Sequence, residues 1–243
     1  MSAPIASEVA VRLAVSEIFG PTFQGEGPSM GRRCAFLRLS GCNLRCSWCD
    51  TPYTWDWTGV NGVAYSVAEE RRMLSVDEVL AQLDGIGTDM VVVSGGEPLL
   101  QQRRLLPLLV ALRSRDLRVE VETAGTIAPA ADVVACVAQF NVSPKLANSG
   151  NVESRRYRPA ALDALQATGK AAWKFVAVSA EDLDELGELV ARHGLAPVYV
   201  MPEGTTAEVI AERSRRLADA VLARGWNLTT RLHVLLYGNR RGV

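Results

Sequence analysis

The sequence lacks the features that mark membrane, secreted and nucleic-acid-binding proteins. Its 243 residues include 26 Lys or Arg and 27 Asp or Glu, so the net charge is −1 and no basic run offers a nucleic-acid footprint. The densest apolar stretch, residues 105–112, is too short to span a bilayer. Glu8, Arg12 and Glu17 interrupt any signal-peptide core in the first twenty residues. We therefore expect a cytoplasmic protein with no membrane or nucleic-acid partner.

Histidine and cysteine are also scarce, which makes their positions informative. There are two histidines and five cysteines, and three of the cysteines lie between Cys42 and Cys49. A reducing compartment disfavours structural disulfides, so clustered thiols there indicate metal or redox chemistry. Cys34 and Cys136 stand apart beside apolar residues, and we interpret them as small core side chains.

Short β-branched runs alternate with longer helical patterns along the chain, which is 48% hydrophobic. Such alternation predicts βαβ units and a parallel sheet, and the length suits one domain over residues 1–243. The expected strands are 35–39, 90–93, 117–121, 140–142, 173–178 and 197–200. The expected helices are 105–112, 159–167, one after Ser179, and two with a Glu three residues after the cap, at Ser75 with Glu78 and at Thr205 with Glu208.

Polar residues follow the end of one expected strand after another. Parallel barrels assemble one site from many such loops, whereas a doubly wound sheet concentrates its site at one switch point. We therefore favour an α/β fold with an incomplete (β/α) barrel of about six parallel strands over the doubly wound alternative. The residues concerned are Ser40, Gly41, Ser94–Glu97, Glu122, Thr123, Ser143, Lys145 and Met201–Glu203.

Cys42, Cys46 and Cys49 have the spacing C-x3-C-x2-C in a loop, residues 40–51, that opens after an expected strand. Thiolates are the soft ligands of iron–sulfur clusters, and three of them can each hold one iron of a four-iron four-sulfur cube. The fourth iron is then left open, as a catalytic metal requires. The alternative is a zinc site, but zinc cysteines usually come as two separated pairs, and the only histidines are His193 and His233.

This arrangement resembles the radical S-adenosylmethionine superfamily, whose signature has an aromatic residue, here Trp48, before the last cysteine. The resemblance implies that the open iron chelates the methionine part of S-adenosylmethionine. It also implies that an electron from the cluster breaks the bond to the 5′ carbon, and that the resulting 5′-deoxyadenosyl radical abstracts a substrate hydrogen. Ser94-Gly95-Gly96-Glu97-Pro98 matches the superfamily loop that holds the methionine amino group.

Further motifs resemble one family in particular, the 7-carboxy-7-deazaguanine synthases. They are Phe23-Gln24-Gly25-Glu26-Gly27, Arg38, Cys49-Asp50-Thr51, Glu122-Thr123-Ala124-Gly125-Thr126 and Ser143-Pro144-Lys145. The resemblance implies conversion of 6-carboxy-5,6,7,8-tetrahydropterin to 7-carboxy-7-deazaguanine with loss of ammonia, on the route to queuosine. It also implies a need for Mg²⁺, a homodimer and a flavodoxin- or ferredoxin-like electron donor.

The family resemblance also implies a role for each matching residue. Thr51 would coordinate Mg²⁺. The S-adenosylmethionine site would comprise Trp48, Cys49, Asp50, Gly96, Glu97, Ser143, Pro144 and Lys145. The substrate site would comprise Phe23, Gln24, Gly25, Glu26, Arg38, Ser94, Glu122 and His233.

The residue chemistry agrees in kind, and each position has a plainer alternative. The planar fork of Arg38 suits a substrate carboxylate, or a surface salt bridge. The amide of Gln24 suits a pterin edge, or it belongs to a simple turn. Glu122 binds ring nitrogens or caps a strand end, Thr51 is a metal ligand or a helix cap, and His233 is a substrate contact or a half-buried strand histidine.

Two other kinds of protein fit part of the sequence. A glycyl-radical-enzyme activase shares the cysteine spacing and small size, but it does not require the Gln24–Gly27 turn or Arg38. A non-catalytic iron–sulfur or zinc protein needs no second ligand pocket, which the Gly96–Glu97 loop argues against. The aromatic-rich insertion at 52–73 screens the cluster or docks a reductase, or it simply packs on the core; we prefer the last interpretation.

Overall fold

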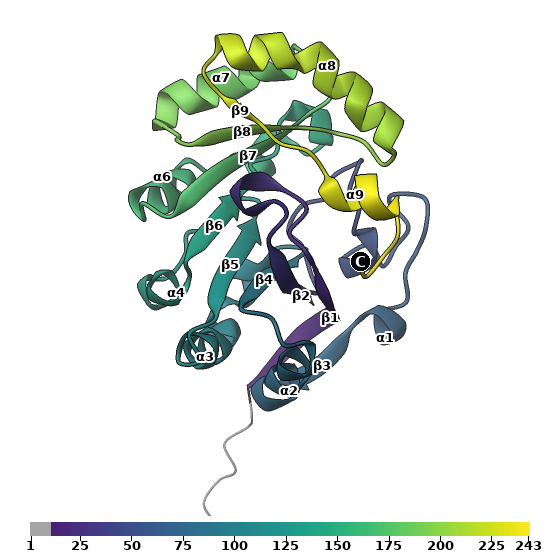
Figure 1. Cartoon of the computed structure of the whole chain (residues 1–243), viewed down its shortest axis with the longest axis vertical. Coiled ribbons are helices and arrows are strands. Elements are labelled where there is room, and N and C mark those ends of the chain that lie inside the picture. The colour runs from purple at the N-terminus through teal and green to yellow at the C-terminus, as the bar shows by residue number, and fades with distance from the viewer. Residues whose placement is uncertain (1–10) are drawn as a thin grey trace, which may run out of the picture.

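The computed structural model describes residues 11–243, in which the chain forms one curved sheet lined by helices (Figure 1). The expectation for the first twenty residues falls partly on residues 1–10, which lie outside the described range. The strands are β1 (Arg12–Phe23), β2 (Arg33–Leu39), β3 (Arg72–Ser75), β4 (Met90–Gly95), β5 (Arg118–Thr123), β6 (Gln139–Val142), β7 (Ala171–Ala177), β8 (Val198–Pro202) and β9 (Asn227–Leu228).

The six predicted strands are present as β2, β4, β5, β6, β7 and β8, and all of them pair in parallel. The whole sheet has the order β3-β1-β2-β4-β5-β6-β7-β8-β9. This arrangement confirms the prediction of a mostly parallel α/β sheet that closes only part of a barrel. Strand β9 adds a short parallel edge, and β1 and β3 extend the other edge in antiparallel pairing.

Strand β1 was not predicted because its sequence contains Gly20-Pro21, a pair typical of a turn. In the structure the strand continues through this pair by means of a register shift between Phe19 and Thr22. Proline is tolerated in a strand where such an irregularity releases its nitrogen from the ladder. Because the bulge contains a turn-like Gly-Pro pair, the sequence pattern did not predict this twelve-residue strand.

The longer helices are α2 (Val76–Ile86), α3 (Gln102–Arg113), α6 (Pro159–Ala167), α7 (Asp182–His193) and α8 (Ala207–Ala223). The short ones are α1 (Val67–Glu70), α4 (Ala131–Cys136), α5 (Glu153–Arg156) and α9 (Leu232–Tyr237), with 3₁₀ turns η1 (Gly27–Ser29), η2 (Pro52–Thr54), η3 (Pro98–Gln101) and η4 (Ala147–Ser149). None of the helices within residues 11–243 combines the length and apolar character needed to cross a membrane.

Helix starts agree with the capping predictions at Ser75 and disagree at Thr205. The Glu78 N–H donates to Ser75 Oγ at 3.2 Å, and the Ser75 N–H donates to the Glu78 carboxylate at 2.7 Å, which completes the predicted capping box. The prediction of Thr205 as a cap is wrong by one residue. The cap is Thr206, whose hydroxyl accepts from the Val209 N–H at 3.3 Å, because a capping oxygen lies three residues before the N–H that it accepts.

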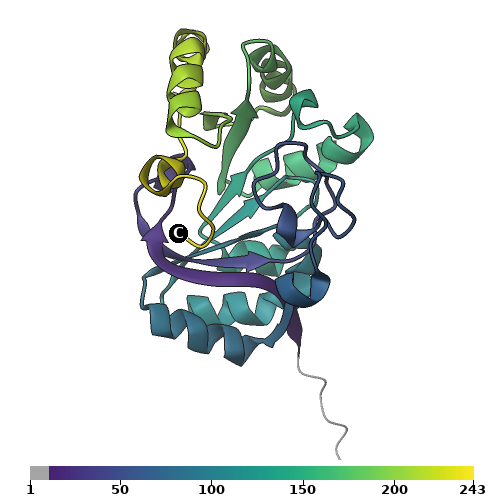
Figure 2. The ribbon, with the colours of Figure 1, turned by 90° about the vertical axis from the view of Figure 1, so that its right-hand side faces the viewer.

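The two faces of the sheet have different chemistry because side chains alternate along each strand. Leu37, Val93 and Val121 point outward and pack with helix residues such as Leu108 and Leu186 in the main core. Figure 2 shows these helices on the outer side of the curved sheet, with the C-terminal segment on its inner side. The intervening strand residues face inward, so the polar ones among them meet inside the curve.

The open side of the barrel is crossed by contacts between the two ends of the described chain. The turn after β1 lies beside the segment that leads into α9 (Figure 1). The Leu232 N–H donates to the Gly25 carbonyl at 2.8 Å, and the Gly27 N–H donates to Thr229 Oγ1 at 3.0 Å. The turn after β1 and the segment after β9 are thereby held together around the interior.

Candidate active site

Strand register places four polar side chains in one row across the inner face. Arg38 of β2 is opposite Ser94 of β4, and Glu122 of β5 is opposite Asn141 of β6. The Ser94 hydroxyl donates to the Glu122 carboxylate at 2.8 Å, which joins the two pairs. The row lines a cavity at the carboxyl ends of the parallel strands, where a barrel assembles its site.

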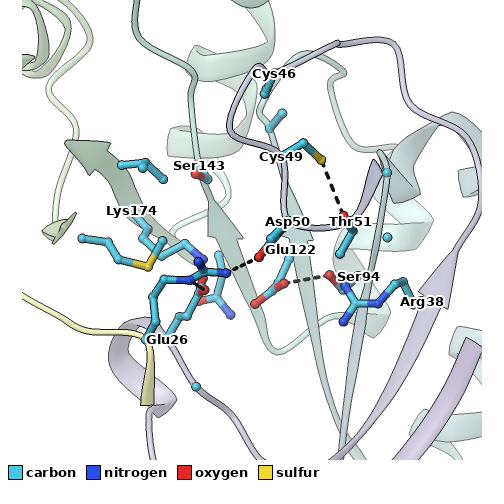
Figure 3. Close-up of a pocket in the computed structure, with 18 of the residues that line it drawn as sticks. Glu26, Arg38, Cys46, Cys49, Asp50, Thr51, Ser94, Glu122, Ser143 and Lys174 are labelled. Atoms are coloured by element: carbon cyan, nitrogen blue, oxygen red, sulfur yellow. Dashed lines mark hydrogen bonds and ion pairs between the residues drawn. The ribbon is translucent and has the colours of Figure 1, made fainter. Parts of the chain in front are cut away.

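Cys42, Cys46 and Cys49 line the same cavity from the loop that follows β2. Burial raises the pKa of Cys42 to about 12, and burial together with the adjacent Asp50 carboxylate raises the pKa of Cys49. Thiolates in such a place need the positive charge of a bound metal to form. Three soft thiol donors around one cavity therefore fit an iron–sulfur cluster. Figure 3 shows Cys46 and Cys49 at one end of the cavity and Arg38, Ser94 and Glu122 at the other.

The Gly95-Gly96 pair brings the loop after β4 against the start of the cysteine loop. The Gly96 N–H donates to the Leu39 carbonyl at 3.1 Å, and the Glu97 N–H donates to the Gly41 carbonyl at 2.9 Å. A Cβ on Gly96 would lie 2.1 Å from the Gly41 oxygen, so only glycine fits there. Both glycines also line the cavity, so the loop packs on the neighbouring backbone with one side and faces the interior with the other.

Glu97 and Pro144 do not line the cavity, unlike the other seventeen positions predicted for the cluster, magnesium, cofactor and substrate sites. The buried Glu97 carboxylate accepts from Thr123 Oγ1 at 2.8 Å and from the Ala124 N–H at 2.8 Å. Burial raises its pKa despite these bonds. Glu97 thus ties the loop after β4 to the end of β5, and its contact with an ammonium group stays a prediction.

Trp48, Ser143 and Lys145 meet on one wall, as expected of residues that share a ligand. Lys145 Nζ donates to Ser143 Oγ at 2.9 Å and lies 5.3 Å from the centre of the Trp48 ring. The Trp48 indole donates to the Asn148 carbonyl at 3.1 Å, which fixes the ring beside the cysteine loop. A cation, a hydroxyl and an aromatic plane together suit a purine nucleoside with a carboxylate.

Gln24, Glu122 and His233 line the opposite wall. Gln24 Nε2 donates to the Glu122 carboxylate at 3.2 Å, so an amide and a carboxylate present acceptors and donors side by side. Gly25 lies against His233, and a Cβ there would be 2.1 Å from His233 Nδ1. His233 belongs to helix α9, so the alternative of a strand histidine is wrong. Burial lowers its pKa, which keeps the imidazole neutral near pH 7.

Arg38 is half of an ion pair inside the molecule. Its Nε donates to Glu17 Oε1 at 2.7 Å, and the Tyr53 hydroxyl donates to the same oxygen at 2.6 Å. Burial opposes the charge of Arg38, but Tyr53 and Glu17 outweigh it and the pKa lies above its usual value. The surface salt bridge considered for Arg38 is wrong, since its side chain is only 15% exposed. Phe23, by contrast, lines the cavity with 41% of its surface exposed.

Lys174 and Arg231 are cavity residues that the sequence analysis missed. Lys174 is buried and ion-paired with Glu26, and Arg231 bridges Glu26, at 3.3 Å, to Asp50. Burial would raise the pKa of Glu26, but Lys174 and Arg231 reverse the effect and hold it well below its usual range. A lone lysine within the apolar strand 173–178 was the available signal for Lys174. Arg231 lies in a loop whose sequence carries no such signal.

Glu26, Asp50 and His233 offer ligand atoms within 4.8 Å of one another, an arrangement that can hold a metal ion. Glu26 is already paired with Lys174, and Asp50 with Arg231. The positive charges of these two side chains oppose the binding of a metal cation at this place. Thr51 precedes η2, yet its side chain makes no capping hydrogen bond and lies 3.8 Å from Cys49 Sγ. The 3.8 Å contact is a long hydrogen bond with the Cys49 thiol, and the hydroxyl oxygen keeps a lone pair for a hard cation beside the cluster loop.

The insertion at 52–73 packs against the core near the cluster loop. Tyr53 and Trp55 are each less than a tenth exposed. The Trp55 indole donates to Cys49 Sγ at 3.3 Å. Both side chains are buried, and Trp55 also lines the cavity, so this part of the insertion packs on the protein and covers the cluster end of the cavity.

Comparison with known proteins identifies the class of the chain. The sequence model of the radical SAM superfamily matches residues 37–238. The fold and the cysteine loop thus define the class: the chain is a radical S-adenosylmethionine enzyme, with a four-iron four-sulfur cluster and S-adenosylmethionine as cofactors.

Relatives narrow the class further. A 7-carboxy-7-deazaguanine synthase of Pyrobaculum aerophilum is 39% identical over 95% of this chain and 97% of its own length. The Bacillus subtilis protein of that name is 31% identical over 97% and 100% of the two chains. The crystal structure of QueE from Escherichia coli superposes with a TM-score of 0.70 at 26% identity, covering 91% of this chain and 95% of that one. The chain belongs to the 7-carboxy-7-deazaguanine synthase family.

Proposed function

We propose that the chain catalyses the radical ring contraction of 6-carboxy-5,6,7,8-tetrahydropterin to 7-carboxy-7-deazaguanine, with loss of ammonia. One observation carries the proposal: a single cavity joins the three cluster cysteines to an arginine and an amide–carboxylate pair. This combination suits a heterocycle that bears a carboxylate, and full-length relatives carry the name of this activity.

Each wall of the cavity has a part in binding the pterin. Arg38, held in place by Glu17, offers its remaining N–H groups to the substrate carboxylate. Gln24 and Glu122 present a donor–acceptor edge to the pyrimidine ring. Lys174 and Arg231 keep Glu26 ionised, so Glu26 accepts from ring or amino N–H groups. The substrate is thus oriented with one edge toward Glu26 and Glu122 and its carboxylate toward Arg38.

The cluster end of the cavity orients the cofactor. When bound, the cluster and S-adenosylmethionine supply the radical that removes a substrate hydrogen. Ser143, Lys145 and Trp48 contact the nucleoside, and the Gly95-Gly96 loop forms the wall beside Cys42. The buried aromatics of 52–73 exclude water from this end.

Magnesium binding by Thr51 belongs to the same proposal. Its hydroxyl, which makes a long hydrogen bond with Cys49 Sγ, lies between the cysteine loop and the Arg38 end of the cavity (Figure 3). Mg²⁺ keeps several oxygen ligands from substrate or water, so one protein hydroxyl suffices to place it. The ion would then hold the substrate carboxylate beside Arg38.

A homodimer and a flavodoxin- or ferredoxin-like electron donor complete the proposal. Family resemblance supports the dimer, and the need for one electron per cluster reduction supports the donor. The activase and non-catalytic alternatives are not favoured, because the full-length relatives are synthases and the cavity holds a second set of ligand-binding residues beside the cluster loop.

The proposal is tested by anaerobic reconstitution of the chain with iron and sulfide, followed by assay with S-adenosylmethionine, Mg²⁺, a reductant and carboxytetrahydropterin. We expect equal amounts of methionine and 5′-deoxyadenosine, together with 7-carboxy-7-deazaguanine. Cleavage of S-adenosylmethionine without any deazapurine would refute the substrate and leave the class intact. A protein that holds zinc or two irons would refute the class as well.

A further inference from the structure

Two side-chain N–H groups from outside the C-x3-C-x2-C motif donate to cluster cysteines. The Trp55 indole N–H lies 3.3 Å from Cys49 Sγ, and the Asn151 amide nitrogen lies 3.3 Å from Cys46 Sγ. Trp55 follows the motif, whereas Asn151 comes from the segment after η4, 105 residues beyond Cys46. Tertiary structure thus brings one donor to each of two sulfurs that would hold iron.

Trp55 is fixed in this orientation. Its residue is 9% exposed, and its backbone N–H donates to the Pro52 carbonyl at 3.0 Å, which anchors it to the end of η2. The indole has a single polar atom, a donor, and that donor faces the sulfur. Packing of the ring therefore determines where the N–H points.

Asn151 is oriented by its carbonyl end. Oδ1 accepts from the Arg45 N–H at 2.8 Å, so the amide nitrogen is turned toward Cys46. The same nitrogen also lies 3.2 Å from Ser149 Oγ and 3.5 Å from the Ser149 carbonyl. A flipped amide would place two donors against each other at Arg45 and an oxygen against the thiolate, which makes the observed orientation the favourable one.

Hydrogen bonds to ligand sulfur change the energy of cluster reduction. Reduction adds one electron, taken from an external one-electron donor, to a cluster whose thiolates already carry negative charge, and no covalent bond changes. An N–H group beside a sulfur stabilises that added charge, so it raises the potential. We infer that Trp55 and Asn151 set the reduction potential of the cluster in this protein.

Two neighbouring groups show why these side chains are singled out. The Leu44 N–H also approaches a sulfur, Cys42 Sγ at 3.4 Å, but it is a backbone group within the motif itself. Trp57 lies in the same loop as Trp55, and no hydrogen bond in the described part of the chain joins its indole to a sulfur. Trp57 therefore provides a matched control of the same residue type.

The inference rests on the cluster of the radical S-adenosylmethionine class, not on the pterin substrate. Its test is an EPR-monitored redox titration of the anaerobically reconstituted protein, comparing wild type with Trp55→Phe, Asn151→Ala, the double variant and Trp57→Phe. Iron content and circular dichroism are recorded for each. Phenylalanine keeps most of the ring packing and removes only the N–H.

We expect Trp55→Phe and Asn151→Ala each to lower the ratio of reduced to oxidised cluster at least threefold at a fixed ambient potential. The double variant should show the product of the two effects, and Trp57→Phe should match wild type. If one of the two single variants cannot hold four irons, the titration of the other single variant tests the inference. Unchanged titrations in loaded variants would overturn the inference, as would loss of the cluster in both, which would show a purely structural role.

Absence of a four-iron cluster from the wild-type protein would instead contradict the class. A cluster that titrates as expected without any turnover of carboxytetrahydropterin would contradict the proposed substrate alone. The two failures are therefore distinguishable from a failure of this inference.

Discussion

At the scale of single residues, the cavity is governed by charges removed from water. Glu26 and Lys174 form an ion pair in which both side chains are less than 15% exposed. Such a pair is costly to break from one side, because the remaining charge stays buried without its partner. Its geometry therefore depends on both members being present.

Lys174→Met should destabilise the fold by about 3 kcal/mol, since Glu26 keeps only Arg231 as a cationic partner. Chemical denaturation of the variant measures this loss. The control is the double variant Lys174→Met with Glu26→Gln, which removes the unpaired charge and should recover part of the stability. A double variant less stable than Lys174→Met would contradict the account.

Arg38→Ala should raise the substrate KM about 30- to 150-fold, equivalent to about 2–3 kcal/mol of binding free energy, because the buried substrate carboxylate would lose its charge partner. Lysine in the same place should not restore it, since an ammonium lacks the planar fork that engages Glu17 and a second carboxylate together. Steady-state kinetics checks both variants, and iron content serves as the control. An unaltered KM would rule out the pairing of Arg38 with substrate.

Thr51→Ala should abolish stimulation of turnover by Mg²⁺ while leaving cluster assembly intact, because the alanine removes the one hydroxyl that we assign to the ion. Thr51→Ser, which keeps the hydroxyl, is the matched control and should behave as wild type. Turnover measured across a magnesium titration gives the result. The role of Thr51 would be rejected by an equal Mg²⁺ dependence in wild type and the alanine variant.

At the scale of elements, close backbone contact joins β2, β4 and the cysteine loop. The Gly96 and Glu97 N–H groups donate to Leu39 and Gly41, so the end of one strand holds the beginning of the cluster loop in place. The junction is made mainly by backbone groups. They can approach this closely because Gly96 has no Cβ.

Gly96→Ala should destabilise the protein by about 3 kcal/mol or prevent cluster assembly, since the new Cβ would overlap the Gly41 carbonyl. Gly85→Ala is the matched control. In the structure no heavy atom lies within 4 Å of the corresponding Cβ, and the residue is within helix α2. That variant should gain about 0.5–1 kcal/mol from helix propensity. Thermal unfolding and iron analysis of the two variants, each compared with wild type, measure these changes in stability and cluster content.

At the scale of the whole molecule, α9 and the turn after β1 close the open side of the sheet, and His233 lies at their junction. Glu26, Arg231, Asp50 and Glu122 are the charged groups that act on this imidazole. Burial dominates and lowers its pKa. The imidazole of His233 is therefore neutral where α9 packs against the turn after β1.

This lowered pKa predicts that acid weakens the fold. Below the ordinary histidine pKa of 6.5 the unfolded chain binds a proton that the folded chain resists, so stability present above pH 6.5 is lost as pH falls. The slope for one histidine is at most about 1.4 kcal/mol per pH unit. Denaturation of wild type and His233→Gln between pH 7.5 and 5.5 tests this. Parallel curves for the two proteins would refute it.

Local sequence was sufficient for much of the architecture. The six parallel strands and the capping box at Ser75 follow from hydrophobic periodicity and short-range hydrogen bonding. Strand β1 was hidden by its Gly20-Pro21 bulge, because only pairing with β2 and β3 makes an extended chain favourable there. The local sequence pattern of β1 contains no information about these partner strands.

The sequence by itself determined the cysteine spacing, the glycine pair and the polar strand ends, since each of these is a short-range property of the chain. Tertiary structure alone decided that Lys174 and Arg231 flank Glu26, that Glu97 is bound by Thr123, and that Asn151 reaches Cys46. The physical reason is sequence distance. These contacts join residues 26 to 205 positions apart, and only the register and curvature of the sheet bring them within reach.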